Sequence, residues 1–197
     1  MNLPNKLTVS RFFLTFIFML LLFAGGLAAR VAALFVFIIA ILTDWFDGLL
    51  ARRNNQLTDF GKFMDPIADK VLVLSAFFAF IELDLVPAWM VVLILFRELA
   101  ITGLRVSALS KHVVIPASEG GKHKTASQMT AIFVVLVFLI FREAAVVMPD
   151  FWTRDTEILF NGVILTVMLI ATALTLISGF SFIYKNREIF TNAEPDN

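Results

Sequence analysis

Six long apolar segments make up most of the chain, and each is long enough to cross a lipid bilayer as a helix. A bilayer-spanning helix needs about 20 mostly apolar residues. The connections between the segments are short and contain no Pro/Gly/Ser-rich linker. The pattern predicts an all-α integral membrane protein with six transmembrane helices, forming a single domain over residues 1–197. The segments are at about residues 10–29, 31–52, 60–82, 85–106, 125–142 and 158–184.

The composition supports a membrane protein and excludes several other classes. The chain is 59% hydrophobic and 16% charged, whereas soluble domains average about 45–50% apolar and about 25% charged residues. Sixteen Lys and Arg residues balance 16 Asp and Glu residues. This zero net charge lacks the basic excess of a nucleic-acid-binding protein, so we expect no nucleic-acid partner. The absence of cysteine excludes disulfides and thiolate chemistry.

Positively charged residues gather on one set of connections, which predicts the orientation. Cytoplasmic loops of membrane proteins carry an excess of Lys and Arg. With the N-terminus inside, only Arg30, Arg142 and Arg154 fall on the outer face, and Arg97 lies within the fourth segment. Both termini are therefore expected in the cytoplasm. The inner face collects Lys6, Arg11, Arg52, Arg53, Lys62, Lys70, Arg105, Lys111, Lys122, Lys124, Lys185 and Arg187.

Four aspartates lie where the second segment ends and the third begins. At 100° per residue, Asp44 and Asp47 share one helix face, and Asp65 and Asp69 share a face on the next helix. The short loop makes the two helices antiparallel neighbours, so the four carboxylates can meet. Small residues that would let a diphosphate approach the backbone share these faces, namely Gly48, Ala51 and Gly61.

Clustered carboxylates in a membrane segment need a compensating charge. An acidic side chain is costly there, and four close together repel one another unless cations neutralise them. Hard oxygen ligands favour Mg²⁺, Mn²⁺ or Ca²⁺ over zinc, and a pair of such ions suits phosphoryl transfer. The alternative is that the aspartates anchor the helices at the membrane interface through ion pairs. Anchoring does not require all the aspartates to lie on facing sides of the two helices. Its partners would be Arg52, Arg53, Lys62 and Lys70.

The string Asp44-x-x-Asp47-Gly48-x-x-Ala51-Arg52, continued after residues 53–60 by Gly61-x-x-x-Asp65-x-x-x-Asp69, resembles the signature of the CDP-alcohol phosphotransferases. The resemblance implies transfer of a substituted phosphate from a CDP-activated lipid to an alcohol, with release of CMP. It implies two divalent cations, Mg²⁺ or Mn²⁺, on the four aspartates, with Asp69 also taking the proton of the attacking hydroxyl. It further implies a homodimer, and nucleotide or diphosphate contacts from Gly48, Arg52 and Thr58.

The N-terminal residues 4–11 resemble the opening segment of the same family, a short interfacial helix that contacts the cytidine end of the substrate. Asn5 and Thr8 are three residues apart and can point the same way. The alternative interpretation is a helix cap with basic anchoring.

Pro66 lies between two of the expected metal ligands and leaves two structures open. If the third helix already runs from Asp59, Pro66 should bend it. If the helix begins near Asp65, Pro66 is a first-turn residue.

The acceptor alcohol has to be recognised by other polar residues. Arg105, Lys122 and Lys124 are predicted at the same membrane face as the aspartates, where they can bind a phosphate on the acceptor. The alternative for these residues is positive-inside anchoring. Glu98 shares a helix face with Arg105, whereas Arg97 points elsewhere, and these two residues form either a structural ion pair or part of a ligand site.

Residues 96–105 and 121–128 are similar to those of bacterial phosphatidylglycerophosphate synthases, a subfamily that joins CDP-diacylglycerol to sn-glycerol 3-phosphate. This similarity implies glycerol 3-phosphate as the acceptor, membrane lipid as a partner, and a bacterial inner membrane location with the active site facing the cytoplasm. The alternatives are a sister transferase that uses inositol phosphate or another alcohol, and a divalent-cation transporter. Transport calls for a polar path continuing outward, yet residues 31–41 and 71–81 are almost wholly apolar.

Overall fold

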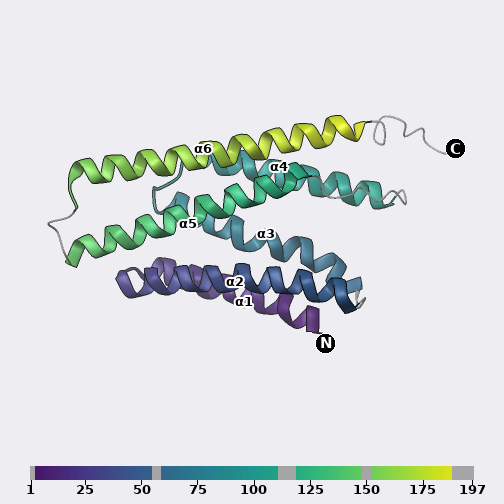
Figure 1. Cartoon of the computed structure of the whole chain (residues 1–197), viewed down its shortest axis with the longest axis horizontal. Coiled ribbons are helices and arrows are strands. Elements are labelled where there is room, and N and C mark those ends of the chain that lie inside the picture. Colours follow the sequence, from purple (N-terminus) through teal and green to yellow (C-terminus); the bar gives the residue numbers. More distant parts are fainter. Residues whose placement is uncertain (1–2, 55–58, 111–118, 148–151, 188–197) are drawn as a thin grey trace. The chain divides into compact units, whose positions relative to one another are not determined.

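The computed structural model describes residues 3–54, 59–110, 119–147 and 152–187. Its side chains are described over 10–43, 70–108, 121–146 and 152–187. Nearly all of the described residues lie in helices (Figure 1), which confirms the all-α prediction. In chain order the helices are α1 (Leu3–Ala24), α2 (Leu27–Asn54), α3 (Asp59–Glu82), α4 (Ala88–Ser110), α5 (Glu119–Val147) and α6 (Arg154–Lys185).

Two of the helices are clearly long and apolar enough to cross a membrane. They are Gly121–Val146 within α5 and Arg154–Lys185, with mean hydropathies of 2.2 and 2.3 over their most apolar 18-residue windows. Shorter apolar stretches, Ser10–Ala24 and Leu27–Thr43, belong to α1 and α2. These ranges were found within the described part of the chain, and the prediction of six spans stays a prediction.

A glycine pair separates α1 from α2 earlier than the hydrophobic pattern predicted. Gly25 and Gly26 have φ values of 70° and 82°, in the left-handed region that glycine adopts without a steric penalty. The first helix therefore ends at Ala24, not near residue 29. At its other end, α1 runs unbroken from Leu3. The expected short N-terminal helix is thus continuous with the first apolar helix, because residues 5–24 contain neither glycine nor proline.

Arg30 was predicted in an outer loop but lies in the first turns of α2, where it is only 5% exposed. Its Nη1 donates to the carbonyl of Leu22 at the end of α1. Its Nε lies 3.5 Å from Glu143 Oε1 on α5. The early helix break explains this position, because it starts α2 at Leu27 and lets the Arg30 side chain reach back to a carbonyl that α1 leaves without a helical partner.

Pro66 lies in the interior of α3, because that helix begins at Asp59. Of the two structures that the sequence left open, the first-turn position is therefore excluded. Proline has no backbone N–H, so the carbonyl one turn earlier in α3 lacks its usual helical partner.

The chain groups into two compact units, and α5 and α6 contribute to both. The first unit comprises Met1–Leu85 and Ile132–Gly162. Within it α1 packs against α2 and α3, and the Phe18 and Phe37 rings lie 5.9 Å apart between centroids. The second unit comprises Val86–Ala131 and Val163–Asn197. The prediction of a single membrane domain over the whole chain stays a prediction.

Candidate functional site

The four aspartates of the signature lie on two successive helices of the first unit. Asp44 and Asp47 fall in the C-terminal part of α2, and Asp65 and Asp69 in the N-terminal half of α3. Both segments are helical at these positions, so the members of each pair are about one turn apart along the backbone. This agrees with the helical spacing on which the sequence argument depends.

The side chains of the predicted metal and nucleotide sites lie outside those that the structure describes. The metal ligands, including the proposed base Asp69, therefore stay predictions. The same holds for the predicted nucleotide and diphosphate contacts, which are Asn5, Thr8, Gly48, Ala51, Arg52, Thr58 and Gly61.

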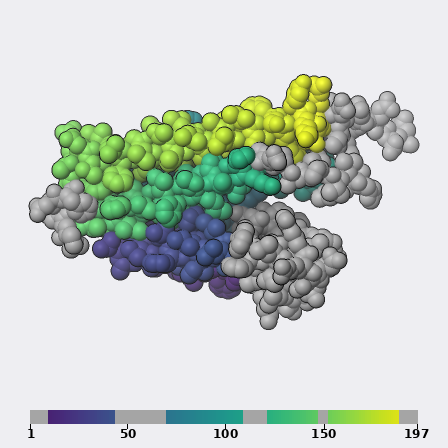
Figure 2. All heavy atoms as spheres, in the orientation of Figure 1, coloured from purple at the N-terminus to yellow at the C-terminus, as the bar shows by residue number. Residues whose placement is uncertain are grey.

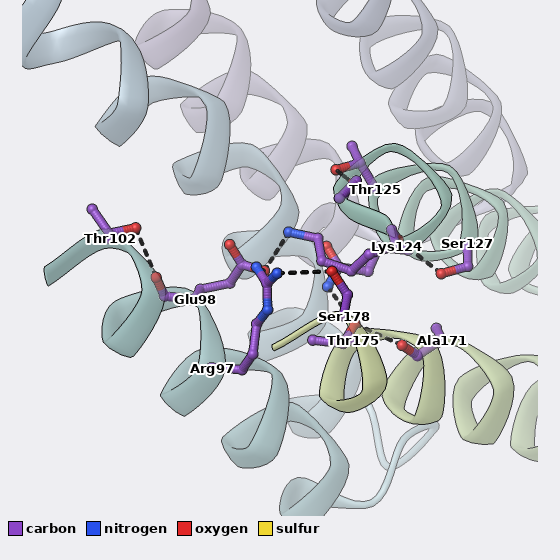
Figure 3. Close-up of polar contacts among 11 residues, drawn as sticks. Arg97, Glu98, Thr102, Lys124, Thr125, Ser127, Ala171, Thr175 and Ser178 are labelled. Atoms are coloured by element: carbon purple, nitrogen blue, oxygen red, sulfur yellow. Dashed lines mark hydrogen bonds and ion pairs between the residues drawn. The ribbon is translucent and has the colours of Figure 1, made fainter. Parts of the chain in front are cut away.

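The second unit contains a buried polar cluster built from three helices (Figure 3). Glu98 on α4 accepts hydrogen bonds at one carboxylate oxygen, Oε1, from two cations. Lys124 Nζ on α5 is one donor, and Arg97 Nη1 lies 3.3 Å away as the other. Arg97 Nη2 also donates to Ser178 Oγ on α6 at 3.1 Å. We refer to Arg97, Glu98, Lys124 and Ser178 as the Glu98 cluster.

The helix-face argument predicted that Arg97 points away from Glu98. This prediction was wrong, because the two side chains are in contact. The two residues are adjacent in sequence, and their Cβ atoms leave the helix about 100° apart. The arginine side chain is long enough to close that angle and bring its guanidinium to the Glu98 carboxylate. Arg97 runs past Gly179 on α6, where an added Cβ would lie only 2.8 Å from Arg97 Cγ. The absence of a side chain at Gly179 therefore makes room for Arg97.

A second polar contact joins α5 to α6 close to the Glu98 cluster. Gln128 Nε2 donates to Thr175 Oγ1 at 3.0 Å, and both residues are buried. Thr175 in turn donates to the carbonyl of Ala171. Figure 2 shows the first part of α5 lying alongside the C-terminal part of α6. These paired polar groups fix the two helices against each other, because a buried polar group without a partner is costly.

The three residues predicted to bind the acceptor phosphate have different surroundings. Lys124 is buried and paired with Glu98, while Lys122 is exposed. The Arg105 guanidinium lies over the Phe182 ring, 5.3 Å from its centroid. Arg105 Nε is buried and has no hydrogen-bond partner among the described residues. The sequence did not indicate that Glu98 and Lys124 are partners, since 26 positions separate them.

Comparison with known proteins places the chain among phospholipid-synthesising enzymes. A family model described as CDP-alcohol phosphatidyltransferase matches residues 1–177. The chain is 44% identical over 148 residues to the CDP-diacylglycerol–glycerol-3-phosphate 3-phosphatidyltransferase of Bacillus subtilis (strain 168), covering 69% of this chain and 77% of that protein. A protein of the same name from Rickettsia typhi (strain Wilmington) is 34% identical over 182 residues, covering 92% of this chain and 94% of that protein. A probable phosphatidylglycerophosphate synthase of Mycobacterium tuberculosis (strain CDC 1551) is 50% identical over 134 residues, which are 66% of this chain and 64% of that protein.

Proposed function

The chain belongs to the CDP-alcohol phosphatidyltransferase family, and from that premise we propose that it transfers the phosphatidyl group of CDP-diacylglycerol to sn-glycerol 3-phosphate. The products are phosphatidylglycerol phosphate and CMP. The observation that carries the proposal is the complete aspartate signature in residues 44–69. The names of the relatives support glycerol 3-phosphate as the acceptor.

The four signature aspartates fit a pair of divalent cations, Mg²⁺ or Mn²⁺. The donor set consists of carboxylate oxygens, which hard cations prefer, and the chain has no cysteine that would favour zinc. Asp44, Asp47, Asp65 and Asp69 would hold the two ions. When bound, such ions neutralise negative charge on the diphosphate and on the leaving group.

Asp69 is the proposed general base. Its carboxylate accepts the proton of the acceptor hydroxyl, and the hydroxyl oxygen forms a bond to the phosphorus that bears the diacylglycerol. The bond between that phosphorus and the CMP oxygen breaks, so CMP departs with the bonding electrons. Arg52 would pair with diphosphate oxygens, for which a guanidinium is well shaped. The other proposed nucleotide and diphosphate contacts are Asn5, Thr8, Gly48, Ala51, Thr58 and Gly61.

The acceptor carries its own phosphate, which calls for a second set of cations. Arg105, Lys122 and Lys124 are proposed for that role. Two of the three, Lys122 and Lys124, are two residues apart in the first turns of α5, and Arg105 is near the C-terminal end of α4. A phosphate dianion gains from several charge-assisted hydrogen bonds at once.

The proposed setting is the bacterial inner membrane, with six spans, both termini in the cytoplasm and the active site facing the cytoplasm. The excess of Lys and Arg on the inner connections supports this orientation. The proposed assembly is a homodimer, as in the family that the sequence resembles.

One assay tests the reaction and identifies the acceptor. Purified protein in mixed micelles is given CDP-diacylglycerol, Mg²⁺ or Mn²⁺ and one of several alcohols, and CMP release is measured. Release with glycerol 3-phosphate alone is expected. Release only with inositol phosphate or another alcohol would identify a sister transferase. No release with any alcohol would favour the divalent-cation transporter.

The Asp69→Asn variant tests the assignment of the base. Asparagine keeps the size of the side chain but cannot accept the proton, so CMP release should fall at least about 100-fold. Asp155→Asn is the matched control, because Asp155 is exposed in the first turn of α6 and should leave the rate unchanged. Near-normal turnover by a folded Asp69→Asn protein would remove Asp69 from the mechanism.

A further inference from the structure

We propose that Glu98 is a positioning residue of the acceptor site, whose carboxylate holds the Lys124 ammonium where it binds the acceptor phosphate. The inference rests on the proposed function, which gives Lys124 that ligand. Glu98 lies outside the aspartate signature, on a different helix from Lys124.

The position of Lys124 depends on Glu98 because both side chains are buried. Glu98 is 5% exposed and Lys124 is 8% exposed. Lys124 Nζ donates to Glu98 Oε1 across the space between α5 and α4 (Figure 3). A buried ammonium is costly unless it is paired, so the carboxylate restricts the charged end of Lys124 to one place. Without Glu98, the flexible four-carbon side chain of Lys124 would lose this contact and be held less firmly in that place.

The Glu98 cluster keeps a net positive charge although Lys124 is paired. Glu98 supplies one negative charge and contacts two positive ones, on Arg97 and Lys124. An ammonium has three N–H donors, so a bond to Glu98 does not exclude a bond to a phosphate oxygen. Arg105 is about two turns further along α4, close enough for its charge to interact with that of Arg97. Among the described residues, the charges around Glu98 therefore favour an anion.

Arg97 is the second cation that holds Glu98, and it bonds the same carboxylate oxygen as Lys124. Its guanidinium donates both to the Glu98 carboxylate and to Ser178 on α6. Gly179, the next residue of α6, leaves the space that the Arg97 side chain occupies. Arg97, which is held by Ser178 of α6, thus fixes the Glu98 carboxylate. The fixed carboxylate in turn positions the ammonium of Lys124 on α5.

The test is the Glu98→Gln variant, with initial rates of CMP release measured while each substrate is varied in turn. Glutamine has nearly the same shape but no charge, so it releases the ammonium from its position. We expect the KM for glycerol 3-phosphate to rise about tenfold, as expected when one charge-assisted hydrogen bond to the phosphate is lost. The KM for CDP-diacylglycerol should stay within about twofold, because the acceptor site alone is affected.

Glu143→Gln is the matched control, because it neutralises another glutamate paired with a buried arginine, Arg30. Glu143 lies about five turns beyond Lys124 on α5. Both KM values should be unchanged in this control. A double-mutant cycle separates positioning from a general structural role. If Glu98 acts through Lys124, then Glu98→Gln should have no further effect on the acceptor KM in a Lys124→Met background. The double variant contains no ammonium at position 124, so it serves if Glu98→Gln alone does not fold.

The outcomes distinguish this inference from the proposed function. Wild-type protein that releases no CMP with glycerol 3-phosphate refutes the proposed function, and the Glu98 assignment is then withdrawn with it. Active wild-type protein whose Glu98→Gln variant has an unchanged or lower acceptor KM overturns the positioning role alone. Equal effects of Glu98→Gln with and without Lys124 would also overturn it.

Discussion

Gly179 is the residue that lets Arg97 lie between α4 and α6. A methyl group there would lie 2.8 Å from Arg97 Cγ and 3.3 Å from Arg97 Nε, and the first distance is too short for a real contact. The crowded atom is in the middle of the arginine side chain, so relief requires moving the whole side chain. That movement would pull the guanidinium from Ser178 and Glu98, whose hydrogen bonds to it are 3.1 Å and 3.3 Å long.

The Gly179→Ala variant should therefore lose stability, despite the better helix propensity of alanine. Overpacking of this kind costs about 1–3 kcal/mol, against about 1 kcal/mol gained in propensity. We expect a lower midpoint of thermal unfolding in detergent. Gly162→Ala on the same helix is the control, because no atom of a described residue beyond its own stretch of helix lies within 4 Å of the added methyl group. It should match or exceed the wild-type midpoint, and an equal loss in both variants would contradict this explanation.

At the scale of helices, the boundary between α1 and α2 depends on Arg30 as well as on Gly25 and Gly26. The glycines allow the left-handed turn, and Arg30 then joins the end of α1 to α5 through the Leu22 carbonyl and Glu143. A buried arginine that joins three helices in this way restricts how they can pack.

Replacing Arg30 by Met should destabilise the first unit, because it leaves Glu143 without its cation and the Leu22 carbonyl without its donor. Glu143 is 22% exposed, so water offsets part of the loss and we expect about 1–3 kcal/mol. Urea unfolding in micelles would measure this change. Arg30→Met combined with Glu143→Met should recover part of the stability, while Arg154→Met, at an exposed site, should have little effect. A double variant less stable than Arg30→Met would show that the charge pair is not the cause.

At the scale of the whole molecule, the proposed topology predicts which helix ends face the cytoplasm. The chain has no cysteine, so single introduced cysteines report accessibility without a background. Asp155 and Lys185 are exposed at opposite ends of α6. In intact cells, an impermeant maleimide should label the Asp155→Cys variant but reach Lys185→Cys only after the membrane is opened. The reverse pattern would invert the orientation, and labelling of both would refute a spanning α6.

The sequence by itself determined the helical class, the approximate positions of the helices and the family. Helices follow from hydrophobic runs, and the family from the fixed spacing in residues 44–69, both of which are local properties. The sequence also contained a signal for the helix break before residue 29, namely Gly25 and Gly26. The continuous hydrophobic run around them led to a prediction that placed the helix end too late.

Only the tertiary structure decided which charged residues are partners. Arg30 with Glu143, and Lys124 with Glu98, join residues 113 and 26 positions apart, and each pair forms because burial makes an unpaired charge costly. The sequence offered Lys124 as one basic residue among several near the inner face. The fold pairs it with Glu98. That carboxylate also contacts Arg97, which joins α4 to α6 through Ser178. Such partners depend on how helices pack, and packing is a property of the whole chain rather than of any one segment.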